Sequence, residues 1–151
     1  MAQDLQGDIL VFLPGKAEIR NVIHRLRHHG DLEVLPLHGG LTLEEQSRIF
    51  KPGRKRRVIA STNVAETSLT IPNIGVVIDS GLARQTQYHR GRGYLTLLPI
   101  AMDSAQQRRG RAGRTARGTC LRLWSEQAPL LDNTRPEIMR ESLVPLVLAA
   151  A

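Results

Sequence analysis

The stretch RRVIASTNVAETSLTIPNIGVVIDSG, residues 56–81, contains two short apolar runs with a polar segment between them. Each run has the length and apolar content of a buried strand. Similar runs lie at 7–15, 32–41 and 118–124. Residues 16–29 place apolar side chains at helical spacing, and Thr42 with Glu45 forms the capping box that begins a second helix. Strands that alternate with helices predict an α/β fold, a parallel sheet with helices on both faces.

One long segment breaks this alternation. Residues 82–100 lack a helical period and hold two strand-like runs on either side of RGRG at 90–93, so they predict a β-hairpin that projects from the sheet. Residues 135–151 are helical in pattern around Pro145 and end while still apolar. We therefore expect residues 1–134 to form one lobe and residues 135–151 to begin a truncated helical connection to a following domain.

The charge of the chain favours a polyanionic partner. Its 151 residues include 21 Lys and Arg against 14 Asp and Glu, a formal net charge of +7. Aromatic residues make up 3% of the chain, which argues against a surface that grips bases by stacking and favours contacts with a nucleic-acid backbone. The lone Cys120, with no membrane-length apolar run and no secretory signal, favours a cytoplasmic protein that does not enter a membrane.

Four polar or glycine-containing segments follow the predicted strands. They are PGK at 14–16, HGG at 38–40, STNVAETS at 61–68 and DSG at 79–81. Parallel sheets bind ligands outside the carboxyl ends of their strands, so these segments are expected to meet at one edge. Glycine loops after strands are common, and each one alone is weak evidence. Together they predict an edge whose hydroxyls and backbone N–H groups suit phosphates.

The segment AQQRRGRAGR, residues 105–114, is the most basic part of the chain. Asp103 or Ser104 is predicted to cap a helix here. Gln107, Arg111 and Arg114 follow one another at steps of four and three, so on a continuous helix they share one face. Arginine binds phosphoryl oxygens in a bidentate manner and can stabilise the charge of a phosphoryl-transfer transition state.

The other residues of this segment have different expected roles. Arg108 and Arg109 lie off the shared face and are candidates for structural pairing or for contact with another lobe. Gly110 and Gly113 each disfavour a helix by about 1 kcal/mol relative to alanine. We expect them to let the helix lie close to a neighbour.

Several motifs together resemble one known family. QRRGRAGR matches the last conserved motif of superfamily 2 helicases, and STNVAETSLTIP with VVIDSG is similar to the preceding motif of the DEAH-box branch. ILVFLPG and LHGGL resemble earlier motifs of the same lobe, in the same order. The resemblance runs from about residue 7 to the end of the chain and is closest to the DEAH/RHA group, which includes HrpA- and HrpB-like helicases. It implies the C-terminal RecA-like lobe of an ATP-dependent RNA helicase, with ATP bound between two lobes and single-stranded RNA across their top.

The resemblance also implies roles for particular residues. Arg111 and Arg114 would be arginine fingers that reach the γ-phosphate, and Gln107 would help to place the attacking water. The implied nucleotide contacts are Phe50, against the adenine, and Thr70, Glu66, Asp79 and Gly81. The implied contacts with the RNA backbone are Pro14, Gly15, Gly39, Gly40, Ser61, Thr62 and Asn63. Phe50 could equally be a core residue, and Pro72 stands where family members often carry an acid. The hairpin at 82–100 matches the strand-separating hairpin of the family.

Two motifs of a complete motor are not in this sequence. It has no G-x-x-x-x-G-K-[ST] phosphate loop and no Asp-Glu-x-His box. The family carries both on the first lobe, together with most of the Mg²⁺ site, so this chain should be nearly inactive as an ATPase without that lobe. The expected partners are RNA, the N-terminal lobe and a helical C-terminal domain.

Two alternatives remain open from the residues. One is a stand-alone basic α/β module that binds nucleic acid without motor activity, and the other is a DNA-directed helicase of the same superfamily. His24 and His28 have a spacing seen in zinc sites, but no cysteine or carboxylate accompanies them. We expect them on a solvated face and predict no metal site in this chain.

Overall fold

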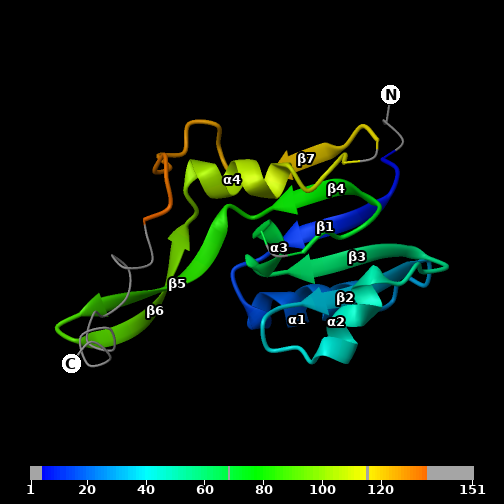
Figure 1. Cartoon of the computed structure of the whole chain (residues 1–151), viewed down its shortest axis with the longest axis horizontal. Helices are drawn as coiled ribbons and strands as arrows, with labels where there is room; N and C mark the ends of the chain where they lie inside the picture. Colours follow the sequence, from blue (N-terminus) through cyan, green and yellow to red (C-terminus); the bar gives the residue numbers. More distant parts are fainter. Residues whose placement is uncertain (1–4, 68, 115, 136–151) are drawn as a thin grey trace.

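The computed structural model describes residues 5–67, 69–114 and 116–135. A five-stranded parallel sheet lies at its centre, with strand order β2-β3-β1-β4-β7 (Figure 1). The strands are β1 (Asp8–Phe12), β2 (Leu32–Leu37), β3 (Arg56–Ser61), β4 (Ile74–Asp79) and β7 (Thr119–Arg122). The predicted parallel α/β fold is confirmed.

Four helices connect these strands: α1 (Lys16–Leu26), α2 (Leu43–Phe50), α3 (Val64–Thr67) and α4 (Met102–Arg109). From β1 to β2 the chain crosses the sheet in one direction, and from β2 through β3 and β4 to β7 it returns in the other. Because such crossovers are right-handed, α1 covers one face, and α2, α3 and α4 cover the other. The predicted capping box of α2 is present, since Thr42 N donates to Glu45 Oε2 at 2.8 Å and Glu45 N donates to Thr42 Oγ1 at 3.2 Å.

The apolar core lies along the three central strands. Leu10, Phe12, Ile59 and Val77 are wholly inaccessible to solvent. Their strands are covered on both faces, which explains why the sequence of each is nearly continuous in apolar residues rather than alternating. Leu37 from β2 and Ile49 from α2 extend the core toward the edge of the sheet.

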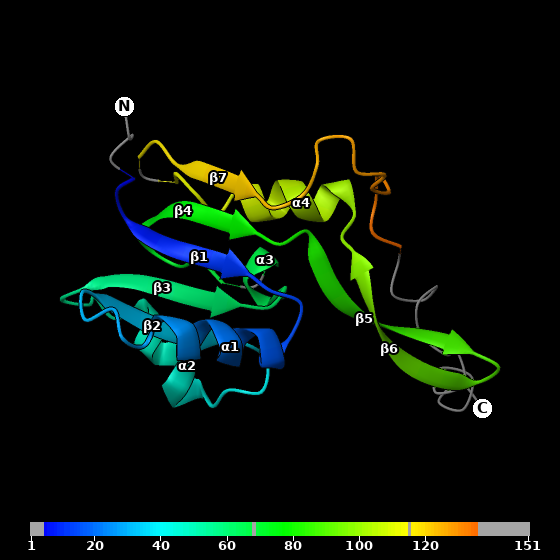
Figure 2. The same ribbon diagram turned by 180° about the vertical axis from the view of Figure 1, so that it is seen from behind.

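A two-stranded antiparallel hairpin projects from the lobe, as Figures 1 and 2 show. It consists of β5 (Leu82–His89) and β6 (Arg92–Pro99). The two loop residues, Arg90 and Gly91, have φ angles of 49° and 75°. Two successive positive φ angles are what a tight type I′ hairpin turn requires. The hairpin predicted at 82–100 is confirmed.

The helix predicted across 105–114 is shorter than expected. α4 ends at Arg109, and Gly110 caps it. Gly113 has a φ of 78°, and a Cβ at this position would lie 2.7 Å from Gly118 N. Gly113 therefore forms a turn, and the prediction that Gln107, Arg111 and Arg114 share one face of a continuous helix is wrong.

The predicted cap of α4 is also wrong. The N-cap residue is Ala101, not Asp103 or Ser104. The carboxylate of Asp103 accepts hydrogen bonds from Ser104 N at 2.6 Å and from Thr134 N and Oγ1 at 2.8 and 2.7 Å. Asp103 thus holds residues near 134 against the start of α4 from within the first turn.

A buried ion pair fastens the amino ends of the strands. Arg57 and Asp8 are both buried, and Nε and Nη2 of Arg57 donate to Asp8 Oδ2 at 2.8 and 2.6 Å. Arg57 belongs to the basic run KPGRKRR at 51–57, but its charge is buried because its carboxylate partner comes from β1.

Most of the predicted helical connection, from residue 136 onward, lies outside the described residues. Within the described part of the chain, no helix is both long and apolar enough to cross a bilayer.

Candidate functional site

The segments that follow the parallel strands meet at the carboxyl edge of the sheet, as predicted. Leu13 N donates to Ser61 O at 2.8 Å, Thr62 N donates to Leu37 O at 3.1 Å, and Ser80 N donates to Phe12 O at 3.2 Å. These backbone bonds hold together the starts of the loops after β1, β2, β3 and β4. We call this surface, which includes residues 14–16, 38–40 and 62–63, the strand-end edge.

The strand-end edge carries positive charge close to exposed backbone. A Cβ at Gly40 would lie 2.5 Å from Lys16 Nζ, so the ammonium group lies directly over this glycine. His38 Nδ1 accepts a hydrogen bond from Gly40 N at 3.1 Å. Burial, followed by the positive charge of Lys16, lowers the pKa of His38, which favours the neutral imidazole that this acceptor role requires. An ammonium group beside glycine backbone is suited to a phosphodiester.

The hairpin adds an arginine to the same edge. Arg84 on β5 forms an ion pair with Glu18 on α1, with Nη2 and Oε1 2.8 Å apart. A Cβ at Gly15 would lie 2.8 Å from Arg84 Nε, so the arginine side chain lies directly over this glycine and would have to shift for a larger residue. No local pattern in the sequence indicates this pair, because its partners are 66 residues apart.

The two candidate arginine fingers lie against one segment of their own lobe. The guanidinium of Arg111 donates to the main-chain oxygens of Glu66 and Leu69, the latter at 2.9 Å. Arg114 Nη1 donates to Thr70 Oγ1 at 3.1 Å. Burial lowers the pKa of Arg111, and the nearby charge of Arg114 lowers it further. These contacts form a second cluster, which we call the arginine cluster and which consists of Glu66, Leu69, Thr70, Arg111 and Arg114.

Arg108 connects the two regions. Its side chain is wholly buried. Its Nε donates to Glu66 Oε1 at 2.7 Å, and its Nη1 donates to Asp79 Oδ1 at 2.8 Å. The guanidinium also lies over the ring of Phe12, 4.8 Å from the centroid. The expectation that Arg108 takes part in structural pairing is confirmed.

Three of the predicted contact residues form hydrogen bonds within the lobe, namely Ser61, Asp79 and Gly81. Asp79 is wholly buried, and its Oδ1 accepts from Gly81 N at 2.9 Å as well as from Arg108. Ser61 is wholly buried too, and its hydroxyl donates to Thr62 O at 2.8 Å. These bonds fix the loops after β3 and β4. Contacts of Asp79 and Gly81 with a nucleotide, and of Ser61 with RNA, stay predictions.

Gln107 lines a polar cleft of about 430 Å³ between the hairpin and the helices. Asn63, Glu66 and Arg84 line the same cleft. Gln107 and Arg111 therefore have Glu66 as a common neighbour, although they do not share a helical face. The cleft also adjoins the strand-end edge through Asn63.

Phe50 lies at the opposite edge of the sheet. It ends α2, is 40% exposed, and lines a cavity of about 720 Å³ with Arg56, Pro72 and Asn73. The exposure disfavours the alternative that Phe50 is a core residue. Pro72 is two residues beyond Thr70, which contacts Arg114. Gly113 N donates to Ile74 O at 3.1 Å, one residue beyond Asn73, so the turn that carries Arg111 and Arg114 lies near this cavity.

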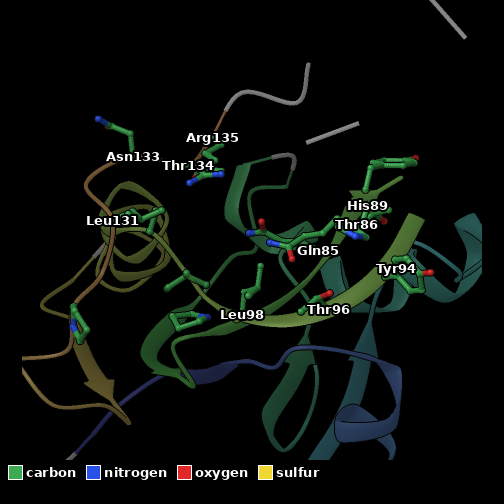
Figure 3. Close-up of a pocket in the computed structure, with 16 residues that line it drawn as sticks. Gln85, Thr86, His89, Tyr94, Thr96, Leu98, Leu131, Asn133, Thr134 and Arg135 are labelled. Carbon is green, nitrogen blue, oxygen red and sulfur yellow. The ribbon is translucent and has the colours of Figure 1, made fainter. Parts of the chain in front are cut away.

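A third cavity, of about 690 Å³, lies along the hairpin. Figure 3 shows Tyr94, Thr96 and Leu98 from β6 on one side of it and Leu131 and Thr134 on the other. Tyr94 is 53% exposed. The sequence predicted the hairpin, but not the segment at 129–135 that faces it.

Among the residues that the structure describes, no three His, Cys, Asp or Glu side chains gather where they could hold a metal ion. His24 and His28 are exposed, as expected.

Comparisons with known proteins bear on this arrangement. Residues 2–116 match the family described as the helicase conserved C-terminal domain. The chain is 43% identical over 157 residues to the ATP-dependent RNA helicase HrpA of Escherichia coli (strain K12), covering 98% of this chain and 12% of that protein. It is also 43% identical over 144 residues to the putative ATP-dependent RNA helicase ucp12 of Schizosaccharomyces pombe, covering 91% of this chain and 11% of that protein.

A solved structure gives the same result. The crystal structure of the Escherichia coli DEAH/RHA helicase HrpB matches with a TM-score of 0.89 at 34% identity, covering 95% of this chain and 19% of that one. The parallel sheet with its antiparallel hairpin is thus a RecA-like α/β fold. The chain belongs to the helicase conserved C-terminal domain family, and its relatives are DEAH-box helicases of the HrpA and HrpB type. It spans about a tenth of the length of the relatives HrpA and ucp12.

Proposed function

We propose that this chain is the C-terminal motor lobe of an ATP-dependent RNA helicase. In this role it supplies Arg111 and Arg114 to ATP bound between two lobes and grips the backbone of single-stranded RNA at the strand-end edge. The chain covers a small share of its relatives, so this activity is proposed for the longer protein that contains it.

The observation that carries the proposal is the arginine cluster. The guanidinium groups of Arg111 and Arg114 lie close enough for the charge of one to lower the pKa of the other. Arg111 donates to Leu69 O, and Arg114 donates to the hydroxyl of Thr70. Paired guanidinium groups suit the oxygens of a transferring phosphoryl group. Phe50 and Pro72 supply an exposed ring and an apolar wall on the same side, which fits a nucleobase.

The lobe provides only part of such a site. Arg111 and Arg114 would stabilise the charge that develops on the γ-phosphate, and Gln107 would orient water. We assign Mg²⁺, the phosphate loop and the general base to the other lobe, because the described residues of this one offer no carboxylate cluster for the metal. The isolated chain should therefore bind nucleotide weakly and hydrolyse it at a negligible rate.

The strand-end edge is the proposed RNA surface. Lys16, Gly40 and Asn63 present a charge, backbone and an amide on one exposed rim. Such groups contact phosphate and sugar without reading sequence, so binding should be independent of sequence and weakened by salt. We place this activity in the cytoplasm, and the hairpin at 82–99 would separate strands at the end of the RNA track.

The test uses the full-length protein that contains this chain. ATP turnover is measured without nucleic acid, with single-stranded RNA and with single-stranded DNA of the same sequence, together with unwinding of a tailed RNA duplex. The proposal predicts ATP turnover that RNA stimulates, and ATP-dependent unwinding. Nucleic-acid binding without ATP turnover would instead support a stand-alone binding module, and a preference for DNA would support a DNA-directed helicase.

A further inference from the structure

We propose that Arg108 is a positioning residue that couples RNA binding at the strand-end edge to the arginine cluster. The inference rests on the proposed function and goes beyond it, because it names the side chain that transmits the effect of one ligand to the other. Arg108 contacts neither proposed ligand, since its side chain is wholly buried.

The first connection runs through α3. This helix has four residues, too few to be stable without tertiary support. Glu66 lies in it, and Glu66 N donates to Asn63 O at 2.9 Å. The side chain of Glu66 is held by Arg108 Nε and by Ser104 Oγ, both at 2.7 Å. Arg108 and its neighbour on α4 therefore fix the position of the short helix that begins at the RNA-facing residues.

The same residue reaches the arginine cluster. The main-chain oxygen of Glu66 accepts a hydrogen bond from the guanidinium of Arg111. A movement of α3 that followed RNA contact at Thr62 and Asn63 would shift this oxygen. It would thereby change how firmly Arg111 is held by its own lobe and how readily it turns toward a phosphate.

The second connection runs to the root of the hairpin. Arg108 Nη1 donates to Asp79 Oδ1 at 2.8 Å and lies 3.3 Å from Leu82 O. Asp79 Oδ1 also accepts from Gly81 N. One guanidinium thus joins α3, the end of β4 and the first residue of β5, and the ring of Phe12 beneath it prevents large displacement.

The Arg108–Asp79 pair has unused hydrogen-bonding capacity. Among the residues that the structure describes, Arg108 Nη2 and Asp79 Oδ2 are both buried and have no hydrogen-bond partner. A native protein seldom leaves such groups unpaired without a reason. A small rotation of the guanidinium would turn the single bond into a bidentate pair. We infer that the pair has two arrangements, which is what an element needs in order to transmit coupling between two sites.

The test compares Arg108→Lys with Arg117→Lys in the full-length protein. Lysine keeps the charge, but it lacks the planar fork that lets arginine bond two carboxylates in fixed directions. Arg117 is exposed, has no assigned role in either ligand site and serves as the control. The measured quantity is the stimulation factor, which is kcat for ATP with saturating RNA divided by kcat without RNA. Melting temperature and the Kd for RNA are measured on the same samples.

We expect Arg108→Lys to lower the stimulation factor by about tenfold, within the range of ordinary coupling energies, and Arg117→Lys to leave it unchanged. The Kd of Arg108→Lys for RNA without nucleotide should stay within about threefold of the wild type, because its RNA-facing groups are intact. An unchanged stimulation factor would overturn the inference. This includes the case in which kcat falls equally with and without RNA, which is what general damage to the lobe would produce.

A second variant covers the case in which Arg108→Lys does not fold. Glu66→Gln keeps an acceptor oxygen for Arg108 and Ser104 but removes the charge, and it should also lower the stimulation factor. A wild-type factor in a folded Glu66→Gln protein would then overturn the inference. The proposed function fails separately, if the wild-type protein itself shows no RNA-stimulated ATP turnover.

Discussion

Two arginines of this lobe are buried against carboxylates, and they differ in how completely they are bonded. Arg57, at the amino ends of the strands, gives two hydrogen bonds to Asp8 Oδ2, and its Nη1 donates to Ile49 O and Lys51 O at 2.6 and 2.9 Å. Asp8 also accepts from Arg57 N and from Asn73. Arg108, near the carboxyl ends, spreads its bonds over Glu66 and Asp79 and leaves buried polar atoms unpaired.

This difference separates a structural role from a functional one. A fully bonded buried pair has a single favourable arrangement and therefore fixes the geometry around it. An incompletely bonded pair can adopt a second arrangement at modest free-energy difference. The first pair lies far from the strand-end edge, at the opposite end of the strands, whereas the second lies between the two proposed ligand sites.

The largest expected effect is on stability and concerns Arg57. Arg57→Ala leaves the Asp8 carboxylate buried without its cation, so the free energy of unfolding should fall by about 3–5 kcal/mol. Urea denaturation of the chain measures this, with Arg54→Ala as an exposed control that should change stability by less than about 0.5 kcal/mol. A loss below about 1 kcal/mol for Arg57→Ala would mean that the pair does not fasten the fold.

The next largest effect is on the free energy of unfolding when lysine replaces Arg57 or Arg108. Arg108→Lys can keep one of its two carboxylate bonds and should lower the free energy of unfolding by about 2 kcal/mol, the value of one lost hydrogen bond to a charged group. Arg57→Lys loses more hydrogen bonds, so its free energy of unfolding should fall further. Urea denaturation of both variants measures which loses more free energy of unfolding. If Arg108→Lys is the less stable variant, Arg57 is not the more strongly structural of the two arginines.

How much of this was available from the sequence depends on the distance along the chain between partners. The strands, the hairpin and the capping box of α2 follow from local patterns, and all were predicted. The arrangement of Arg111 and Arg114 was not, because Gly110 and Gly113 end the helix that their spacing suggested.

The partners in the long-range pairs were not predicted, although Arg108 was identified as a candidate for structural pairing. The partner of Arg57 lies 49 residues away, and Arg108 and Asp79 are 29 residues apart. The periodicity of apolar residues along the sequence does not indicate such pairs. The strand-end edge was predictable because parallel sheets gather the carboxyl ends of their strands at one edge. The approach of Phe50 to Pro72 was not, because it depends on how β3 and β4 each pair with β1, which lies between them.

The smallest effect extends the comparison to a less buried carboxylate. Burial opposes the ionisation of Asp103, but hydrogen bonds from Thr134 and Ser104 outweigh it and lower its pKa. A carboxylate with a lowered pKa in the folded state contributes stability above its unfolded pKa of about 3.9, and this contribution is lost as the pH falls through the folded pKa.

Asp103→Asn should therefore lower the free energy of unfolding by about 1 kcal/mol at pH 7 and by much less near pH 3. Parallel urea titrations at the two pH values measure the difference. A penalty that is the same at both values would show that the charge of Asp103 contributes nothing.

The central claim is that this lobe completes an ATP site with Arg111 and Arg114. It is tested most directly by the kcat for ATP of the full-length protein carrying Arg114→Ala, with Arg117→Ala as the exposed control and the Kd for RNA measured on the same preparations. The account predicts that Arg114→Ala lowers kcat by about a thousandfold or more, while the control turns over ATP normally and RNA binding stays largely intact. ATP turnover by Arg114→Ala at close to the wild-type rate would contradict it.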